Sequence, residues 1–233
     1  MVFPAPGEPP ADPAPAFKGL AIAQVDSNDA TSWRLFATNF SQGRVDVFDG
    51  SFPAGRRSGL SWTRRFPKAT SPFGIQAIGS TIYVTYALRN PDTGDDVAGP
   101  GHGFVNAFDL SGQLGRRASR RGGPLNSPWG LAWASDQFRQ SSVVSCSSAT
   151  SATGASTRSH CSRTGRYETQ RAAASRSSGP PLHGIEGLWA IQFGKGGSTV
   201  TRSQLFFTAG PDDENGGLFG FLTAAGSPGH NKD

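Results

Sequence analysis

The segment Ser127-Pro-Trp-Gly-Leu-Ala-Trp-Ala134 recurs in modified form three more times in this chain of 233 residues. The other copies are Phe17-Lys-Gly-Leu-Ala-Ile-Ala23, Ser71-Pro-Phe-Gly-Ile-Gln-Ala-Ile78 and Ile185-Glu-Gly-Leu-Trp-Ala-Ile191. Their glycines, Gly19, Gly74, Gly130 and Gly187, are 55, 56 and 57 residues apart. A nearly constant period of this length is typical of stacked supersecondary units, such as the blades of a β-propeller.

Three of the four copies are followed by two segments with the composition of half-buried antiparallel strands, rich in aromatic and β-branched residues or alternating in polarity. These pairs are Leu35–Phe40 with Gly43–Asp49, Ile82–Tyr86 with Gly103–Asp109, and Leu205–Thr208 with Gly217–Leu222. No segment has a convincing helical period. We therefore predict an all-β fold, a β-propeller arc of about four blades built from antiparallel strands.

The composition agrees with a turn-rich β protein, because the chain has 31 glycines and 17 prolines. No run of eighteen apolar residues occurs, so we expect no membrane span. The N-terminal sequence has no basic region followed by an apolar core, so no signal peptide is visible. We expect a disordered, proline-rich N-terminus over 1–15, propeller repeats within 16–225 at about 17–70, 71–126, 127–183 and 184–225, and a tail over 226–233.

The net charge of +5 raises the question of nucleic-acid binding, but the charge is unevenly distributed. Residues 54–70 and residues 139–180 each account for +5, so the rest of the chain carries about −5. Neither basic segment interleaves its arginines with the stacking aromatic residues that single-strand binders use. We therefore expect no nucleic-acid partner.

The same two basic segments interrupt the repeat. Residues 139–180 are rich in Ser, Ala and Thr where the second and third strands of the third unit should lie. Read one frame over with GC-rich codons, this segment encodes a strand, a turn and a strand, and residues 54–70 also regain a β-like sequence. We interpret both segments as frameshifted and poorly ordered. Cys146 and Cys161 lie in the longer segment, so no disulfide or metal pair is inferred from them.

Several motifs along residues 16–224 are specific in combination. They are Lys18-Gly-Leu-Ala21, Ala37-Thr-Asn-Phe40, Val45-Asp-Val-Phe-Asp-Gly50, Tyr83-Val-Thr-Tyr86, Asp95-Asp-Val-Ala-Gly-Pro-Gly-His-Gly-Phe-Val105, Leu125-Asn-Ser-Pro-Trp-Gly-Leu-Ala132, Gly187-Leu-Trp-Ala-Ile-Gln-Phe-Gly194 and Phe207-Thr-Ala-Gly-Pro-Asp-Asp-Glu-Asn-Gly-Gly-Leu-Phe-Gly220. Together they resemble a family of uncharacterised bacterial proteins, exported β-propellers of the six-bladed NHL-like and TolB-like class.

The resemblance implies an extracytoplasmic location: periplasmic, secreted or at the cell surface. It implies a monomer when the propeller is intact. Family members are longer at the N-terminus, so the resemblance also implies that this chain is a truncated member, a fragment of a six-bladed propeller that lacks about two blades and a secretion signal.

Residues that precede the repeat glycines are candidates for a ligand site at the channel mouth, where equivalent propeller positions cluster. They are Lys18, Phe73, Trp129 and Glu186, and we add Asn39 and Asn126 as polar groups near the same mouth. The charged residues could orient a polar ligand and the aromatic residues could stack on it. In the alternative interpretation the aromatic rings plug the channel and the charges are solvated or paired.

Two acidic loops are candidates for a divalent metal. The loop Asp92–Gly103 contains Asp95 and Asp96, and the loop Gly210–Gly217 contains Asp212 and Asp213. Calcium or another divalent metal prefers oxygen ligands of this kind on a flexible loop. Asp and Gly are also ordinary turn residues, so solvated turns are the alternative. No cofactor is otherwise indicated.

The chain contains no nucleophile elbow, Walker loop or dinucleotide fingerprint. We therefore expect a non-enzymatic extracytoplasmic binding or scaffold module, whose partner is an unknown protein, glycan or small molecule. One alternative is a metal-dependent, lactonase-like propeller hydrolase, in which channel carboxylates and asparagines hold a metal that activates water. Another is a truncated gene product without function.

Overall fold

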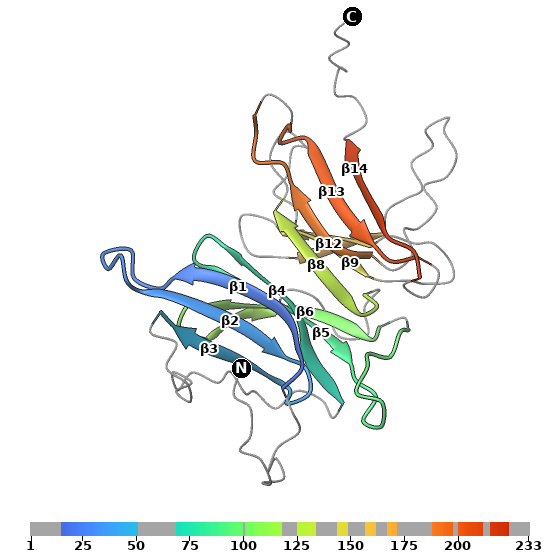
Figure 1. Cartoon of the computed structure of the whole chain (residues 1–233), viewed down its shortest axis with the longest axis horizontal. Coiled ribbons are helices and arrows are strands. Elements are labelled where there is room, and N and C mark those ends of the chain that lie inside the picture. The colour runs from blue at the N-terminus through green and yellow to red at the C-terminus, as the bar shows by residue number, and fades with distance from the viewer. Residues whose placement is uncertain are drawn as a thin grey trace, which may run out of the picture. The chain divides into compact units, whose positions relative to one another are not determined.

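The computed structural model describes residues 15–50, 69–99, 101–117, 125–133, 144–148, 157–161, 167–171, 188–197, 200–211 and 215–223. Within these ranges all regular structure is strand, and every pairing whose register is described is antiparallel (Figure 1). The predicted all-β antiparallel fold class is therefore confirmed, and the architecture is consistent with part of a β-propeller.

The strands follow one another through the sheets in chain order. The first sheet contains β1 (Phe17–Gln24), β2 (Trp33–Asn39) and β3 (Arg44–Asp49). The second sheet contains β4 (Thr70–Ile78), β5 (Thr81–Leu88), β6 (Gly103–Asp109) and β7 (Leu114–Arg117). The last sheet contains β12 (Leu188–Phe193), β13 (Gln204–Ala209) and β14 (Leu218–Thr223).

Between the second and the last sheet, β8 (Pro128–Trp133) pairs with β9 (Val144–Ser148), and β10 (Thr157–Cys161) pairs with β11 (Tyr167–Arg171). β9, β10 and β11 belong to the segment 139–180 that we interpret as frameshifted. Their backbones are described and their side chains are not. Residues 1–14, 51–68 and 224–233 lie outside the described ranges, so the expectations for both termini and for the segment 54–70 stay predictions.

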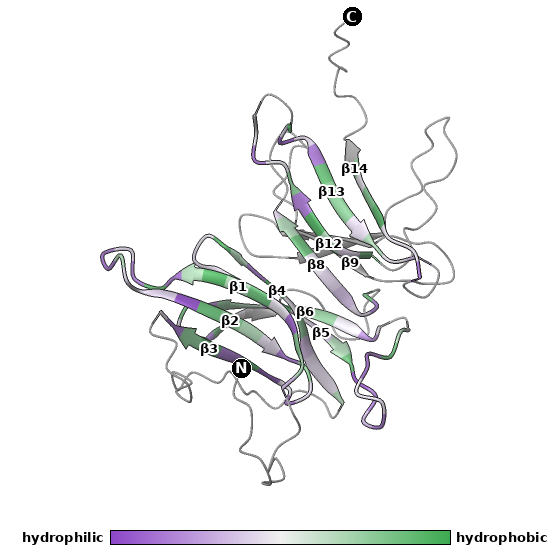
Figure 2. Ribbon diagram, viewed as in Figure 1, coloured by the Kyte–Doolittle hydropathy of each residue, from purple (hydrophilic) through white to green (hydrophobic). Residues whose placement is uncertain are grey.

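The sheets form because their strands are rich in apolar, aromatic and β-branched residues and end at turn residues. Figure 2 shows hydrophobic residues along the strands and hydrophilic residues in the connecting turns. The β2–β3 turn contains Gly43 at φ 65°, and the two-residue β4–β5 turn contains Gly79 at φ 59°. Both angles lie in the left-handed region, which glycine enters without steric cost. The part of the chain that the structure describes holds no helix long and apolar enough to cross a membrane.

The chain divides into two compact units, residues 1–128 and 129–233, and each is described by itself. In the first unit, the first and second sheets pack face to face. One buried cluster joins Ala21, Ala23, Phe36, Val45 and Val47 of the first sheet to Ile75, Ile82, Val84, Tyr86, Phe104 and Phe108 of the second. In the second unit, Ala132 of β8 shares a cluster with Leu188, Ile191, Phe193, Leu205, Phe207 and Ala209 of the last sheet.

Glycine allows neighbouring first strands to approach closely in both units. An added Cβ on Gly19 would lie 3.1 Å from backbone atoms of Phe73 and Ile75 in β4. An added Cβ on Gly130 would lie 3.0 Å from the backbone nitrogen of Ile191 in β12. The repeated glycine is therefore a packing feature of the sheets, as the sequence period indicated.

The register of the last sheet corrects the alignment of the fourth copy. Gly19 pairs with Thr38, and Gly74 donates its N–H to the Thr85 hydroxyl at 2.7 Å. In the last sheet the residue paired with the equivalent threonine, Thr208, is Ala190. Gly187, on which the sequence alignment placed this copy, is three residues earlier and lies outside the described ranges. The alignment was wrong because it matched the glycine of a short sequence motif, whereas strand pairing places Ala190 at that position.

Candidate functional site

One end of the first unit gathers the loops that are candidates for a binding site. In an antiparallel sheet, the start of the first strand, the end of the second and the start of the third lie at the same end. We call this end the rim; it is made by residues 15–18, 39–44, 69–73, 86–99, 101–104 and 125–128. Figure 1 shows the strand ends that carry it.

Hydrogen bonds join the rim segments to one another. The Phe40 N–H donates to the Ala16 carbonyl at 2.8 Å, and the Arg89 N–H donates to the Ala69 carbonyl at 2.6 Å. The Gly99 N–H donates to Asn126 Oδ1 at 2.5 Å. Each bond ties a loop to the segment that precedes a first strand, so the loops are held by the sheets rather than hanging free.

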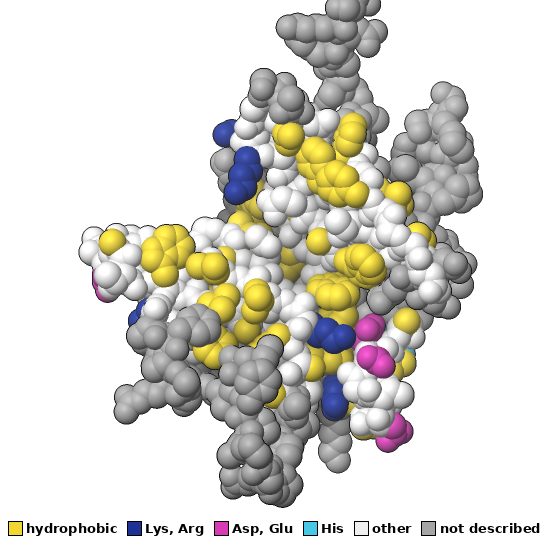
Figure 3. Space-filling model, in the orientation of Figure 1, with side chains coloured by type: hydrophobic (Ala, Val, Ile, Leu, Met, Phe, Trp, Pro, Cys, Tyr) yellow, Lys and Arg dark blue, Asp and Glu magenta, His cyan; other side chains and the backbone are white. Residues whose placement is uncertain are grey.

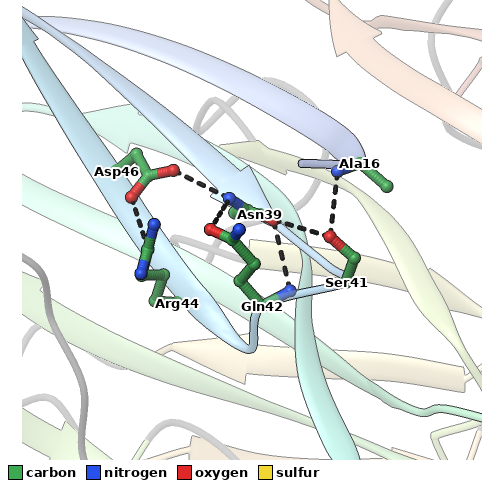
Figure 4. A network of polar contacts seen from close by, with 6 residues as sticks. All are labelled: Ala16, Asn39, Ser41, Gln42, Arg44 and Asp46. Carbon is green, nitrogen blue, oxygen red and sulfur yellow. Dashed lines mark hydrogen bonds and ion pairs between the residues drawn. The ribbon is translucent and has the colours of Figure 1, made fainter. Parts of the chain in front are cut away.

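Asn39 is the centre of the polar network at the β2–β3 turn (Figure 4). Its Nδ2 donates to Gln42 Oε1 and to Asp46 Oδ2, both at 2.8 Å. Its Oδ1 accepts from the Ser41 hydroxyl at 3.1 Å and from the Gln42 N–H at 3.2 Å. The side chain is fully buried, so its whole hydrogen-bonding capacity is used inside the protein.

The network continues outward from Asn39. Arg44 Nε lies 2.8 Å from Asp46 Oδ1 in an ion pair, and the Ala16 N–H donates to the Ser41 hydroxyl at 3.1 Å. Among the described residues, Arg44 Nη2 is buried without a hydrogen-bond partner. The arrangement fixes the β2–β3 turn against the start of β1.

Lys18 and Phe73, two of the predicted ligand residues, meet at the ring of Phe40. Lys18 Nζ lies 5.9 Å from the Phe40 centroid, within the range of a cation–π contact. The Phe40 and Phe73 rings have their centroids 5.2 Å apart. Phe73 is buried and Lys18 is half-buried, so in this structure the phenylalanine ring is covered and the ammonium group is the more accessible of the two.

The β5–β6 loop, residues 89–102, is braced by its own hydrogen bonds. Asn90 Oδ1 accepts from the Asp92 N–H at 2.9 Å, and the Asn90 N–H donates to the Asp95 carbonyl at 2.8 Å. Arg89 and Asp96 form an isolated β-bridge. His102 Nδ1 lies 2.9 Å from the Val97 carbonyl. The tip of the loop, at Asp92, Thr93 and Asp95, is exposed, and Asp96 is half-buried.

Asn126 and Ser127 lie buried beside this loop. Ser127 has φ 40°, an uncommon value for a residue with a side chain, and its buried Oγ has no hydrogen-bond partner among the described residues. The next residue, Pro128, packs on Gly103, where an added Cβ would overlap the proline ring. This contact holds Pro128 against the end of the β5–β6 loop within the first unit.

Tyr86 and Asn106 form a second buried polar pair near the rim. The Tyr86 ring stacks on Phe104 with centroids 4.6 Å apart. Burial raises the pKa of Tyr86 well above its usual range, and the hydrogen bond with Asn106 only partly opposes that effect. Asn106 Oδ1 is buried without a hydrogen-bond partner among the described residues. The pair sits where Asn39 and Asp46 sit in the first sheet.

In the second unit the structure describes only part of the predicted site. Trp129 is half-buried at the start of β8. Glu186, Asp212 and Asp213 lie outside the described residues, so their predicted roles stay predictions. The register assigns the position equivalent to Lys18 to Trp189, which sequence reasoning did not select. Its ring packs on Gly210, where any Cβ would overlap it.

The metal prediction is tested only for part of the chain. Across the described ranges, the structure brings together no group of three His, Cys, Asp or Glu side chains that could hold a metal ion. Asp95 and Asp96 are described, and their predicted partners from the Gly210–Gly217 loop are not. A calcium site remains a prediction from the sequence.

Sequence reasoning missed most members of the Asn39 network and the rim bonds. Gln42 and Asp46 carry an ordinary turn and strand sequence, so no local signal marks them. Their role depends on antiparallel pairing, which places Asp46 opposite Ala37 and Arg44 opposite Asn39. Trp189 could have been found by aligning the threonines Thr38, Thr85 and Thr208 in place of the glycines.

Comparisons with known proteins give relatives without an assigned function. No protein-family model matches the chain. "Uncharacterized protein L690" and "Uncharacterized protein R648" of Acanthamoeba polyphaga mimivirus are 32% and 31% identical to it over 121 residues. The matched region is 49% of this chain and 29% and 28% of those proteins, so the chain matches less than a third of the length of either.

A solved structure of a catalytically inactive virginiamycin B lyase from Staphylococcus aureus, determined with quinupristin, is similar with a TM-score of 0.39 and 11% identity. The similarity covers 87% of this chain and 54% of that one.

Proposed function

We propose that this chain is part of a non-enzymatic binding or scaffold module that works outside the cytoplasm and holds its partner at the rim of the first unit. The β5–β6 loop carries the proposal. Backbone N–H groups of Asp92 and Gly99 donate to the side chains of Asn90 and Asn126, while Asp92, Thr93 and Asp95 at the tip of the loop are exposed. Loops held by a rigid sheet are common carriers of binding function. The location outside the cytoplasm is supported by the family resemblance.

The chemistry of the tip favours a partner with basic groups. Asp92 and Asp95 present exposed carboxylates. Arg89 joins Asp96 through a backbone β-bridge, and its Nη2 lies 3.8 Å from an added Cβ on Gly94, so the tip carries two carboxylates beside one guanidinium. An amine-bearing glycan or a basic protein segment would meet this charge and could also bond the Thr93 hydroxyl. In this proposal Asn39 and Asn126 are positioning residues, which act through the loops they hold.

The test is binding of the whole chain to an array of oligosaccharides that carries amine-bearing and N-acetylated forms of the same sugars. We expect binding to the amine-bearing forms. The Asp92→Asn and Asp95→Asn double variant should bind about tenfold more weakly, which corresponds to about 1.4 kcal/mol. The asparagines keep the size of the side chains and remove only their charge.

The matched control is the Asp26→Asn and Asp29→Asn double variant, which removes two carboxylates from the β1–β2 turn at the opposite end of the first sheet. This variant should bind like the unmodified chain. Equal effects of the two double variants would contradict the rim as the site, and no binding to any member of the array would contradict an amine-bearing glycan as the partner. Cleavage of a bound sugar, or a rise in melting temperature with calcium alone, would favour the metal-dependent hydrolase.

A further inference from the structure

The packing of the first sheet on the second provides a template for contacts between sheets. We call the face of a sheet that packs on the next sheet along the chain its trailing face, and the opposite face its leading face. The trailing face of the first sheet includes Phe36, Val45 and Val47, all buried in the cluster shared with the second sheet. The leading face of the second sheet supplies Ile75, Ile82 and Val84 to the same cluster.

The trailing face of the last sheet has the same register positions, but here they are exposed. Phe206 corresponds to Phe36. Phe36 pairs with Ala21, two residues after Gly19, and Phe206 pairs with Gln192, two residues after Ala190. Strand pairing then places Phe219 and Phe221 at the positions of Val45 and Val47. Phe219 is 71% exposed and Phe221 is 54% exposed. Their rings lie 5.9 and 5.7 Å from the ring of Phe206.

The leading face of the first sheet is also exposed. Leu20 and Ile22 occupy the same positions in β1 as Ile75 and Ala77 occupy in β4. In the second sheet, Ile75 and Ala77 pack toward the first sheet. Leu20 and Ile22 are both 62% exposed, and Trp33 at the end of the first sheet is 49% exposed. Figure 3 shows hydrophobic side chains gathered over β1 and β2 and, separately, over β13 and β14. Contiguous exposed apolar side chains are typical of interaction surfaces.

We propose that copies of this chain associate through these two faces, with the trailing face of the last sheet of one copy packed on the leading face of the first sheet of another. The contact repeats the one between the first and second sheets. Each copy carries both the leading face of the first sheet and the trailing face of the last sheet. A second copy therefore offers side chains at the same strand positions as those that pack between the first and second sheets. The interface is heterologous, since different surfaces meet, and it can extend or close into a ring.

The side chains of the last sheet suit this contact. Ala190 occupies the position that glycine has in β1 and β8. At Gly19 and Gly130, the backbone of the neighbouring first strand lies about 3 Å from the place of an added Cβ. The methyl group of Ala190 therefore keeps two first strands farther apart than β1 and β4. Phe219 and Phe221 are larger than Val45 and Val47, so they fill the wider space between the outer strands.

The experiment uses one charged variant for each face of the whole chain. Ile22→Glu blocks the leading face, and Phe219→Glu blocks the trailing face. Sedimentation velocity over a wide range of protein concentration should show a rising mass for the unmodified chain. Each variant alone should stay a monomer. An equimolar mixture of the two should form a species of two chains, because each variant retains the face that its partner needs.

Two controls keep this result open to contradiction. Lys195→Glu, a charge reversal at the exposed β12–β13 turn, should associate like the unmodified chain. Circular dichroism and thermal unfolding should show that Ile22→Glu and Phe219→Glu stay folded, as their exposure indicates. A monomeric unmodified chain, self-association of either variant alone, or folded variants that fail to combine in the mixture would overturn the proposal. The second outcome would indicate that like faces pair.

Discussion

Single polar side chains, as well as the repeated glycines, hold the rim of the first unit together. Asn39 uses all its donors and acceptors on Ser41, Gln42 and Asp46. Thr38 donates to the Phe73 carbonyl of the next sheet at 2.6 Å. A buried polar group that loses its partner costs about 1–3 kcal/mol. These residues therefore influence stability out of proportion to their size.

Asn39→Ala should lower the free energy of unfolding by about 2–4 kcal/mol, because it removes the buried hydrogen bonds that the Asn39 amide makes with Asp46, Gln42 and Ser41. Urea unfolding followed by fluorescence measures the change. The control is Asn28→Ala at the exposed β1–β2 turn, which should change stability by less than about 0.5 kcal/mol. Equal effects of the two substitutions would contradict the role of the network.

Asp109 should make stability depend on acid pH. The Ser111 hydroxyl donates to its carboxylate at 2.6 Å and is the main reason why the pKa of Asp109 is lowered; backbone N–H groups of the turn add to it. A lowered pKa in the folded state stabilises the protein above the ordinary Asp pKa of about 4, and this contribution is lost as pH falls through the folded value.

The measurement is the melting temperature of the unmodified chain and of Asp109→Asn from neutral to acid pH. The unmodified chain should be the more stable of the two at neutral pH, and the difference should shrink below pH about 4. A difference that stays constant over this range would show that the ionised carboxylate contributes nothing.

At the scale of strands and loops, close backbone approach decides which connections fit together. Pro128 at the start of β8 packs on Gly103 at the start of β6, and the Trp189 ring of β12 packs on Gly210 after β13. In each place a bulky ring uses the space that glycine leaves. A larger residue at the glycine would displace the element that the ring belongs to.

Gly103→Ala should lower the free energy of unfolding by about 1–3 kcal/mol, the usual cost of overpacking. Its Cβ would overlap the Pro128 ring and lie 3.1 Å from the Tyr86 carbonyl oxygen. Gly50→Ala is the matched control, because nothing lies within 4 Å of an added Cβ there. Urea unfolding should show the control to change stability by less than about 1 kcal/mol. A neutral Gly103→Ala would mean that the Pro128 ring does not pack on this glycine.

At the scale of the whole molecule, each unit has one sheet with an exposed apolar face. The residues at the same strand positions in neighbouring sheets, such as Ile75, Val45 and Val47, are buried. Association through such faces stabilises the folded form by mass action. The melting temperature of the unmodified chain should therefore rise with protein concentration. Differential scanning calorimetry at several concentrations measures it, and Phe219→Glu should abolish the dependence. A melting temperature that does not vary with concentration would contradict self-association.

Much of the fold was readable from local patterns. Alternating strands, turn glycines and the 55- and 56-residue spacings of Gly19, Gly74 and Gly130 predicted antiparallel β units in chain order. Asn39 and Asn126 were named as candidates, and the structure places both in the buried polar contacts of the rim. These features were accessible because strand pattern and turn type depend on neighbouring residues.

The register of the last sheet, the Asn39 network and the identity of the open faces were not readable in this way. Thr38 meets the Phe73 carbonyl across 35 positions of the chain, and Gly99 meets Asn126 across 27. Such contacts arise only when sheets pack, and no local pattern specifies which neighbour a face will meet. Phe36 and Phe206 share a strand position, yet one is buried and the other partly exposed, because burial depends on the surface that arrives opposite a side chain.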